Sequence, residues 1–483
     1  PGLVVDLENQ FVMPGFRDGH CHPLFAGREH LGPNVTDATS LPQIQEILVT
    51  YGQANPDDLW IDGAAYDRSI DAKFVRSELD AAIADRPVVL HGADHHTLWV
   101  NTRALEISGL MDSVPDLSVG SVDLGDDGLP NGILREWEAM QLVMGKIPAL
   151  SLEKELECLS WAQELLFRNG VVEVQDAWID PGMVEVYVEA ARRDGLILKT
   201  DLAFRADPKT WKTDFGYFDE RREEVSNLGH PLLTADTMKF FVDGVLGSST
   251  ASVLEPYVAG PSTGSHGELV WDKSALLDAA NQANASGYQL HLHAIGDLGV
   301  RTALDIIETV GTRLPAVIAH TELVSDADIT RFAKLNVVAN FEPLWAREDG
   351  QLLSCVHQVG RARLDTMYRM RDLADSGAII SFGSDWPVSS PIPIAGIATA
   401  VTRALQGGPG WSLGQALNIG EALAAYTSGS ASQISCGQRN GLLKAGSPAE
   451  FVILSANPFV LESQALFDLQ VIGTSSKSRP FTK

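Results

Sequence analysis

The feature that most constrains the fold is a series of eight short, β-prone apolar runs that end in polar residues able to do chemistry. The runs are FVMPGFRDGHCH at 11–22, VVEVQDAW at 171–178, ILKTDLAFR at 197–205, MKFFVDG at 238–244, YQLHLHAIGD at 288–297, AVIAHTE at 316–322, VVANFEP at 337–343 and AIISFGSD at 378–385. Near-continuous apolar runs of this length are typical of strands buried on both faces, as in a parallel sheet.

Helix-like stretches separate these runs. The clearest lie at 274–287, 300–311 and 325–336, and Ser274 and Ser325 stand where helix N-caps are expected. Strand–helix alternation over eight units predicts an α/β fold, the (β/α)8 or TIM barrel. Active sites of that fold are built at the C-terminal ends of the strands. This sequence places histidines, a lysine and aspartates there.

Two segments fall outside the alternation. Residues 24–165 separate the first run from the second, far beyond a usual βα loop of about 2–6 residues. They have strand and helix signals of their own, so we interpret them as a cap subdomain inserted after strand one. The stretch GLLKAGSPAEFVILSANP at 441–458 predicts a hairpin of two strands beside the barrel. The predicted domains are a barrel over 11–435, which includes the cap, and small β-sandwich parts at 1–10 and 436–483.

Charge and cysteine content limit the partners. The chain has 63 Asp and Glu against 36 Lys and Arg, a formal charge of −27. So acidic a surface repels phosphate backbones and anionic lipid, and no apolar run reaches the length of a membrane span. We therefore expect a small-molecule substrate, without nucleic acid or membrane partners.

The same composition indicates a compartment. The four cysteines lie far apart without a CxxC motif, which favours a reducing compartment, the cytoplasm. No signal peptide is visible. A homodimer is the expected assembly, because two-fold dimers are the commonest oligomers.

Histidines near the strand ends are candidate metal ligands. His20 and His22 form an H-x-H, and side chains two apart on a strand point to the same face. Such a pair suits a divalent transition metal. His293 and His320 also stand near strand ends, although either one alone is as well explained by a hydrogen-bonded core or surface role. His291 shares the face of His293 but lies deeper, as a ligand or as a group that supports one.

Asp385 and Lys239 complete the set of chemically capable residues. Asp385, in FGSDWP, is either a turn former or helix cap or a metal ligand that takes a proton from the attacking water. Lys239 lies within the apolar run TMKFFVDG. A lysine that points into a dry interior has a lowered pKa, and its neutral amine can react with carbon dioxide to give a carbamate that bridges two metal ions. The alternative is a lysine that snorkels to solvent.

The order of these residues along the chain identifies a family. H-x-H, Lys, His, His and Asp fall on predicted strands one, four, five, six and eight. With the segments VMPGFRDGHCH, HTLWVNTRAL, GILRE, KFFVDGVLGSSTA, HAIGD, IAHTE, FGSDWPV and GLLKAGSPAEFVIL, the chain resembles the amidohydrolase superfamily and, within it, the YtcJ-like amidohydrolase family 3. Family members usually begin with further strands of the β-sandwich, so an incomplete sandwich is expected here. Glu450 stands where the family often has Asp.

The resemblance implies a binuclear metal hydrolase, usually with zinc. The six ligands would be divided between two ions: His20, His22 and Asp385 on one, His293 and His320 on the other, with carboxylated Lys239 as the bridge. A hydroxide shared by the ions would attack, and Asp385 would accept its proton and deliver it to the leaving nitrogen.

Substrate-facing residues are expected in two places. His96, Trp99 and Asn101 match the family's H-x-x-W-V-N segment in the cap; they either reach the substrate or hold the cap together. Three more residues follow the second and eighth strands and are expected at the barrel mouth: Asp176, Trp178 and Trp386.

These expectations favour hydrolysis of a carbon–nitrogen bond in an amide, N-formyl or N-acyl amine. A mononuclear deaminase of a heterocycle stays open, because it needs the histidines and Asp385 but not carboxylated Lys239. An ester or lactone hydrolase is a close variant. A barrel that binds a small ligand without turnover is disfavoured, since simple binding has no use for the complete ligand set.

Overall fold

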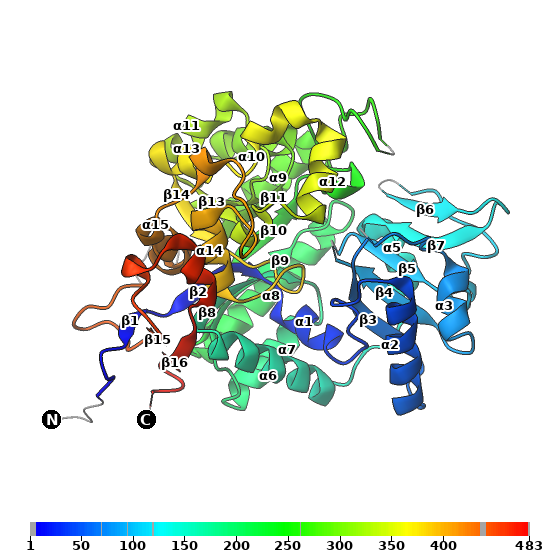
Figure 1. Cartoon of the computed structure of the whole chain (residues 1–483), viewed down its shortest axis with the longest axis horizontal. Coiled ribbons are helices and arrows are strands. Elements are labelled where there is room, and N and C mark those ends of the chain that lie inside the picture. Colours follow the sequence, from blue (N-terminus) through cyan, green and yellow to red (C-terminus); the bar gives the residue numbers. More distant parts are fainter. Residues whose placement is uncertain are drawn as a thin grey trace. The chain divides into compact units, whose positions relative to one another are not determined.

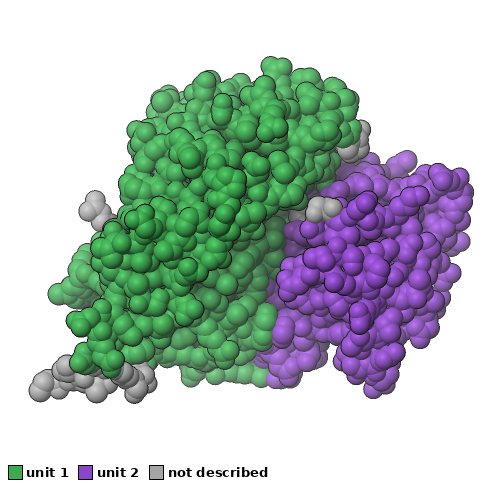
Figure 2. Space-filling model, in the orientation of Figure 1, with its two compact units in different colours: residues 1–23, 160–483 green, residues 24–159 purple. Residues whose placement is uncertain are grey.

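The computed structural model describes residues 6–68, 70–93, 95–117, 120–260, 262–434 and 441–481. The chain forms two compact units, one from residues 1–23 with 160–483 and the other from residues 24–159 (Figure 2). The second unit occupies most of the segment in which the sequence predicts an insertion, residues 24–165.

The larger unit is built on a sheet of eight parallel strands (Figure 1). In sheet order they are β2 (Phe16–Cys21), β8 (Val171–Ile179), β9 (Lys199–Arg205), β10 (Leu233–Phe241), β11 (Gln289–Ala294), β12 (Ala316–His320), β13 (Val337–Phe341) and β14 (Ile379–Phe382). Just beyond β14, the N–H of Asp385 donates to the carbonyl of His20 at 2.7 Å. The last strand is thus tied to the first, and the predicted TIM-barrel class is confirmed.

Helices with one apolar face cover the strands. α10 (Asp297–Val310) buries Val300, Ala303, Leu304 and Ile307, the spacing of an amphipathic helix. It ends at Gly311, whose φ of 62° suits a residue without Cβ. Other helices that lie mostly in this unit are α6 (Leu152–Arg168), α7 (Val184–Arg192), α8 (Trp211–Leu228), α9 (Lys273–Ala285), α11 (Asp326–Lys334), α12 (Gly350–Val359), α13 (Met370–Asp375), α14 (Pro393–Thr402), α15 (Ile419–Ala424) and α16 (Ser430–Ile434).

The predicted first run, residues 11–22, is not one strand. Phe11–Pro14 form β1, which pairs antiparallel with β15 (Phe451–Leu454), and the barrel strand begins only at Phe16. Between them the N–H of Gly15 donates to the Glu450 carbonyl at 3.0 Å. A Cβ on Gly15 would lie 2.7 Å from the Val172 side chain. One apolar run therefore serves two sheets, which its pattern does not reveal.

The hairpin predicted at 441–458 is also wrong. Only 451–454 form a strand there, and its neighbours in a three-stranded sheet are β1 and β16 (Val471–Ser475). β1 and β16 occupy the two edges of β15, so the Gly, Ser and Pro residues before β15 do not mark the turn of a hairpin. The N-cap of α9 is likewise not Ser274 but Asp272, whose carboxylate accepts from the N–H groups of Ser274 and Ala275.

The smaller unit has its own sheet and two cores. Its strands are β3 (Ile61–Tyr66), β4 (Val88–Gly92), β5 (Thr97–Val100), β6 (Ser121–Leu124) and β7 (Pro130–Arg135), with helices α1 (Pro23–Glu29), α2 (Leu41–Ala54), α3 (Arg76–Ala82), α4 (Thr102–Ile107) and α5 (Glu136–Met144). Alternate residues of β5 face opposite cores: Trp99 packs in the cluster that contains Leu48, and Leu98 in the cluster that contains Met140. A unit with its own cores is a domain in the usual sense.

Among the helices of the described residues, none combines the length and the apolar character needed to cross a membrane.

Closure of the barrel generates a test at Gly383. A Cβ there would lie 2.7 Å from Cβ of His20 and 2.8 Å from its backbone nitrogen, so Gly383→Ala must push β14 away from β2. Overpacking of this kind costs about 1–3 kcal/mol. We expect thermal and urea unfolding to show that loss. Gly216→Ala in α8 is the control, because nothing lies within 4 Å of its added Cβ and alanine is the better helix former. Unchanged stability in Gly383→Ala would contradict this account of closure.

Candidate active site

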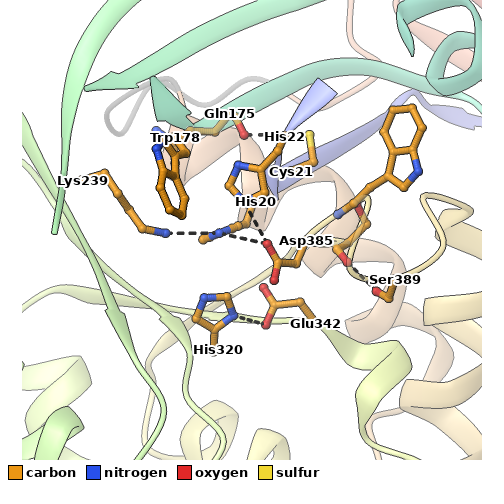
Figure 3. Close-up of polar contacts among 12 residues, drawn as sticks. His20, Cys21, His22, Gln175, Trp178, Lys239, His320, Glu342, Asp385 and Ser389 are labelled. Carbon is orange, nitrogen blue, oxygen red and sulfur yellow. Dashed lines mark hydrogen bonds and ion pairs between the residues drawn. The ribbon is translucent and has the colours of Figure 1, made fainter. Parts of the chain in front are cut away.

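Five of the six predicted metal ligands lie together near the C-terminal ends of the barrel strands in Figure 3: His20, His22, Lys239, His320 and Asp385. His20 is central: its Nε2 lies 3.2 Å from Nζ of Lys239 and 3.4 Å from Oδ1 of Asp385. Nε2 of His22 lies 2.9 Å from the same carboxylate oxygen. The rings of His20 and His320 are 4.7 Å apart between centroids.

His293 completes the cluster. Its ring centroid lies 4.5 Å from that of His320. All six side chains, from strands far apart in sequence, therefore belong to one continuous group. Within it, ligand atoms of His20, His320 and Asp385 all lie within 4.8 Å of one another, and all three residues are buried. Imidazole nitrogens and a carboxylate at such spacing suit Zn²⁺ or a similar divalent ion.

Each of three imidazoles is held by one ring nitrogen, which determines the nitrogen that would ligate a metal. His20 Nδ1 contacts Nε2 of His291 at 2.9 Å, which leaves Nε2 of His20 as the nitrogen that would ligate. His293 Nε2 donates to the Gly244 carbonyl at 3.1 Å, which assigns Nδ1 to the metal. His320 Nδ1 contacts Oε2 of Glu342 at 2.9 Å, which assigns Nε2. Anchoring of this kind fixes both tautomer and ring orientation.

Burial shifts Lys239 and His20 toward their neutral forms. Burial acts on His22 in the same way, but its hydrogen bonds with Asp176 and Asp385 outweigh it and raise the His22 pKa. Burial lowers the pKa of Lys239 to about 7, against the opposing pull of Asp385 and Glu342. Burial, followed by repulsion from Lys239, lowers the pKa of His20 well below its usual range. Neutral nitrogens have the lone pairs that metal binding requires.

The pKa values of the two carboxyl groups of the site are shifted in opposite directions. Burial raises the pKa of Glu342 well above its usual range, and the charge of Asp385 raises it further. Burial also acts to raise the pKa of Asp385, but the hydrogen bond from His22 and the nearby His320 outweigh it, so the pKa of Asp385 is lowered. Asp385 is therefore ionised at neutral pH, whereas burial shifts Glu342 toward its protonated form.

Two buried aspartates fix the rim. Asp18 of β2 accepts from the Ser384 N–H at 3.0 Å and from the Ser384 hydroxyl at 2.5 Å, which sets the residue before Asp385. Asp243, just after β10, accepts from the N–H groups of Ile295 and Gly296 at 3.0 and 2.9 Å. These bonds lock the loops that follow β14 and β11.

Glu342 is a site residue that the sequence analysis missed. It directly follows β13 and is fully buried, with its carboxyl group on His320. A carboxylate that ends the seventh apolar run is the same signal that singled out Asp385 at the end of the eighth.

Two of the residues expected at the barrel mouth, Asp176 and Trp178, differ in burial. Asp176 is fully buried; it accepts from the Tyr187 hydroxyl at 2.5 Å and its Oδ1 lies 3.8 Å from Nδ1 of His22. It therefore supports a ligand rather than facing the mouth. Trp178 is partly exposed and packs against Phe241, with ring centroids 4.8 Å apart.

Trp386 also packs within the larger unit. It is 7% exposed, and its ring lies 5.8 Å from that of Trp161 between centroids. Its backbone carbonyl accepts from the N–H of His22 at 2.7 Å. The residue thus contributes to the site through its backbone, next to a predicted ligand.

The three residues expected on the cap lie inside the smaller unit. Trp99 is fully buried and its indole N–H donates to the Val75 carbonyl at 3.1 Å. The amide of Asn101 donates to the carbonyls of Ile83 and Arg86 and accepts from two backbone N–H groups. Both residues hold this unit together, one of the two roles the sequence left open. Nδ1 of His96 contacts a Glu136 carboxylate oxygen at 2.8 Å.

The lowered pKa of Lys239 generates a pH prediction for the metal-free protein. The unfolded amine has a pKa of 10.5 and the folded one about 7, so the unfolded state binds more protons between these values. The cost of burying Lys239 is complete below about pH 7 and falls as the pH rises toward 10.5. Lys239→Met removes this cost.

Lys239→Met should therefore raise the unfolding temperature of metal-free protein near about pH 6 and bring a smaller gain near about pH 9. Thermal unfolding after chelator dialysis measures the difference. Lys334→Met is the control, since the Lys334 side chain is 72% exposed, and should shift neither value. If the rise in unfolding temperature from Lys239→Met were larger at high pH than at low pH, the folded protein would not lower the pKa of the Lys239 amine.

Comparisons with known proteins agree with this geometry. The YtcJ protein of Bacillus subtilis (strain 168) is 27% identical over 481 residues, which cover 97% of this chain and 88% of that protein. An N-substituted formamide deformylase of Arthrobacter pascens is 24% identical, covering 98% of this chain and 88% of the enzyme. An uncharacterized metal-dependent hydrolase from Pyrococcus horikoshii OT3 has a similar structure, with a TM-score of 0.76, 27% identity, and coverage of 96% of this chain and 89% of that one.

The predicted resemblance is confirmed by a family-wide match. The sequence profile described as "Amidohydrolase family" matches residues 3–479, nearly the whole chain, and the barrel bears the histidines, lysine and aspartate at one rim. The chain belongs to the amidohydrolase family.

Proposed function

We propose that this protein is a metal-dependent hydrolase that cleaves a carbon–nitrogen bond in an amide, N-formyl amine or N-acyl amine. The observation that carries the proposal is the single buried cluster of four imidazoles, one lysine and one aspartate at the barrel rim. Two similar proteins support it by name, one a formamide deformylase and the other a metal-dependent hydrolase.

The ligands fit two divalent ions, most simply zinc. One ion would take His20, His22 and Asp385, the other His293 and His320, and a carbamate on Lys239 would bridge them. Bound there, the ions would polarise the scissile carbonyl and lower the pKa of water.

Lys239 is suited to carbamate formation. The neutral amine attacks the carbon of CO₂. As the nitrogen–carbon bond forms, one carbon–oxygen π bond breaks and its electron pair moves to oxygen, and one proton passes from the nitrogen to water. The product is an anionic group with two oxygens in place of a buried amine. Burial supplies the neutral amine near neutral pH, because it lowers the Lys239 pKa to about 7.

Asp385 is suited to proton transfer. Its pKa is lowered, so it is ionised when an attacking water must lose a proton. The protonated carboxyl group then donates to the leaving nitrogen, which departs as a neutral amine.

Aromatic side chains bound the cluster on two sides. Trp345 lies parallel to the His320 ring, 5.5 Å away between centroids, and Phe241 lies 4.9 Å from His293. Such walls favour apolar groups on the acyl or amine side of the substrate.

A mononuclear deaminase of a heterocycle is the second candidate. It is favoured by the compact triplet of His20, His320 and Asp385, whose ligand atoms lie within 4.8 Å and suffice for one ion. An ester or lactone hydrolase would use the same residues and differs only in the substrate.

Metal content tests the proposal. We expect two zinc ions per chain by elemental analysis after purification with zinc, and hydrolysis of N-formyl or N-acyl amines that is lost on chelation and restored by zinc. Lys239→Ala should retain one ion or fewer and lose most turnover, because the bridging group is gone.

Lys334→Ala is the matched control, an exposed lysine on α11, and should keep both ions and full turnover. One ion in the wild-type protein, with activity on a heterocyclic amine, would favour the deaminase. Protein without metal after zinc loading would refute both candidates.

A further inference from the structure

A layer of buried polar side chains fills the barrel beneath the metal-ligand cluster. We call Gln175, Asp201, Thr237, His291 and Gln433 the polar layer; each is at most 2% exposed. Thr237 and His291 precede Lys239 and His293 by two residues on β10 and β11, so they share the inward face one step deeper. Interiors of such barrels are usually filled with branched apolar side chains. The polar layer of this barrel differs from that usual filling.

The hydrogen bonds of this layer run in one direction, toward Asp201. Its carboxylate accepts from the hydroxyls of Thr234 and Thr237 at 2.7 and 2.6 Å and from the Asp236 N–H at 3.2 Å. It also accepts from Nε2 of Gln175 at 3.0 Å. At the other end of the Gln175 side chain stands the amide nitrogen of Gln433, which is fixed as a donor because it also donates to the Gly19 carbonyl. The amide oxygen of Gln175 therefore faces Gln433, and its amide nitrogen faces Asp201.

That oxygen fixes the tautomer of His291. Oε1 of Gln175 lies 2.8 Å from Nδ1 of His291 and also accepts from the Gln433 amide at 2.7 Å. Because the oxygen has no proton to give, Nδ1 of His291 must be the donor, and Nε2 of His291 then has a lone pair. That lone pair faces Nδ1 of His20 at 2.9 Å.

The tautomer of His291 determines which ring nitrogen of His20 has a lone pair for a metal ion. A contact of this length between two neutral imidazoles holds one proton, and His291 Nε2 accepts it from His20 Nδ1. His20 therefore presents an unprotonated Nε2, the atom beside Lys239 and Asp385. Every proton of the chain points away from the ligand cluster and toward Asp201.

We propose that Asp201, Gln175 and His291 form a hydrogen-bond relay that fixes the tautomer and orientation of His20 and so positions its Nε2 for a metal ion. The inference rests on the proposed metal-dependent function and deepens it. His291 is a positioning residue here, not a ligand, because both of its ring nitrogens are engaged, one by Gln175 and one by His20.

The relay differs from the supports of two other histidines. His320 is held directly by the Glu342 carboxyl group, and His293 by the backbone carbonyl of Gly244. His20 is instead hydrogen-bonded to His291, and His291 to the amide oxygen of Gln175. The amide nitrogen of Gln175 in turn donates to the carboxylate of Asp201. Supporting groups of this kind raise the basicity of a metal-bound imidazole.

Leucine and glutamine at position 291 separate this role from packing. His291→Leu removes the acceptor for His20 and should weaken zinc binding by about 10–100-fold, measured by competition with a chromophoric chelator. His291→Gln can accept from His20 Nδ1 through its amide oxygen and should recover most of the affinity. A packing role would instead appear as a change in the unfolding temperature of the metal-free protein, with zinc affinity unmoved.

Gln175→Leu provides a second test with His291 intact. Without the amide oxygen, His291 can adopt the tautomer that protonates Nε2, which forces the His20 proton onto the metal side; the same loss of affinity is expected. Ser381→Ala is the matched control, because Ser381 is a fully buried side chain of β14 whose hydroxyl bonds Asn340 and Ser430 rather than Asp201, Gln175 or His291. Its zinc affinity should equal that of the wild type.

The possible results separate failure of the relay proposal from failure of the proposed metal-dependent function. Wild-type protein that binds no zinc would overturn the proposed function itself. Wild-type protein that binds zinc, with His291→Leu and Gln175→Leu binding it equally well, would overturn the relay alone. Equal losses in His291→Leu and His291→Gln would also overturn it, since an acceptor would then be insufficient. Loss in the two leucine variants with recovery in His291→Gln would support it.

Discussion

The backbone hydrogen bond from Asp385 to His20, at 2.7 Å, is the contact on which the site depends. It joins the end of the barrel to its beginning and places two proposed ligands, 365 positions apart in the numbering of the chain, next to each other. Asp18 strengthens the same junction from β2 by accepting two hydrogen bonds from Ser384. A barrel that failed to close here would keep its strands but lose the meeting of histidine and carboxylate.

Closure also explains the electrostatics. Taking ionisable side chains out of water disfavours their charged forms, so burial pushes Lys239 and His20 toward neutrality and Glu342 toward its protonated form. Asp385 escapes this trend because His22 donates to it. Lowered pKa values on His20 and Lys239 beside the ionised carboxylate of Asp385 are the character of a cation site.

Much of this could be predicted from sequence because the topology of a parallel barrel turns chain order into position. Strand ends meet at one rim, so polar residues that close apolar runs, such as His320 and Asp385, had to be neighbours. The same logic does not tell which way a residue of the insertion faces. Trp99 and Asn101 matched a family segment, yet the pleat of β5 and the cap of α4 bury them inside their own unit. Direction depends on register and packing partners, which a single sequence does not contain.

The polar layer shows a second limit and a second regularity. Gln175 and Asp201 look like ordinary interruptions of apolar strands, and only the assembled barrel reveals that they bond each other. Isolated, each buried polar group would destabilise the fold. Here they form a series: the Asp201 carboxylate accepts from the Gln175 amide, the amide oxygen accepts from His291, and His291 accepts from His20. Each buried polar group thereby has a partner, and His20 is held in one tautomer. An apolar layer would offer Nδ1 of His20 no acceptor, so nothing on that side would keep the proton away from Nε2, which lies 3.4 Å from the Asp385 carboxylate.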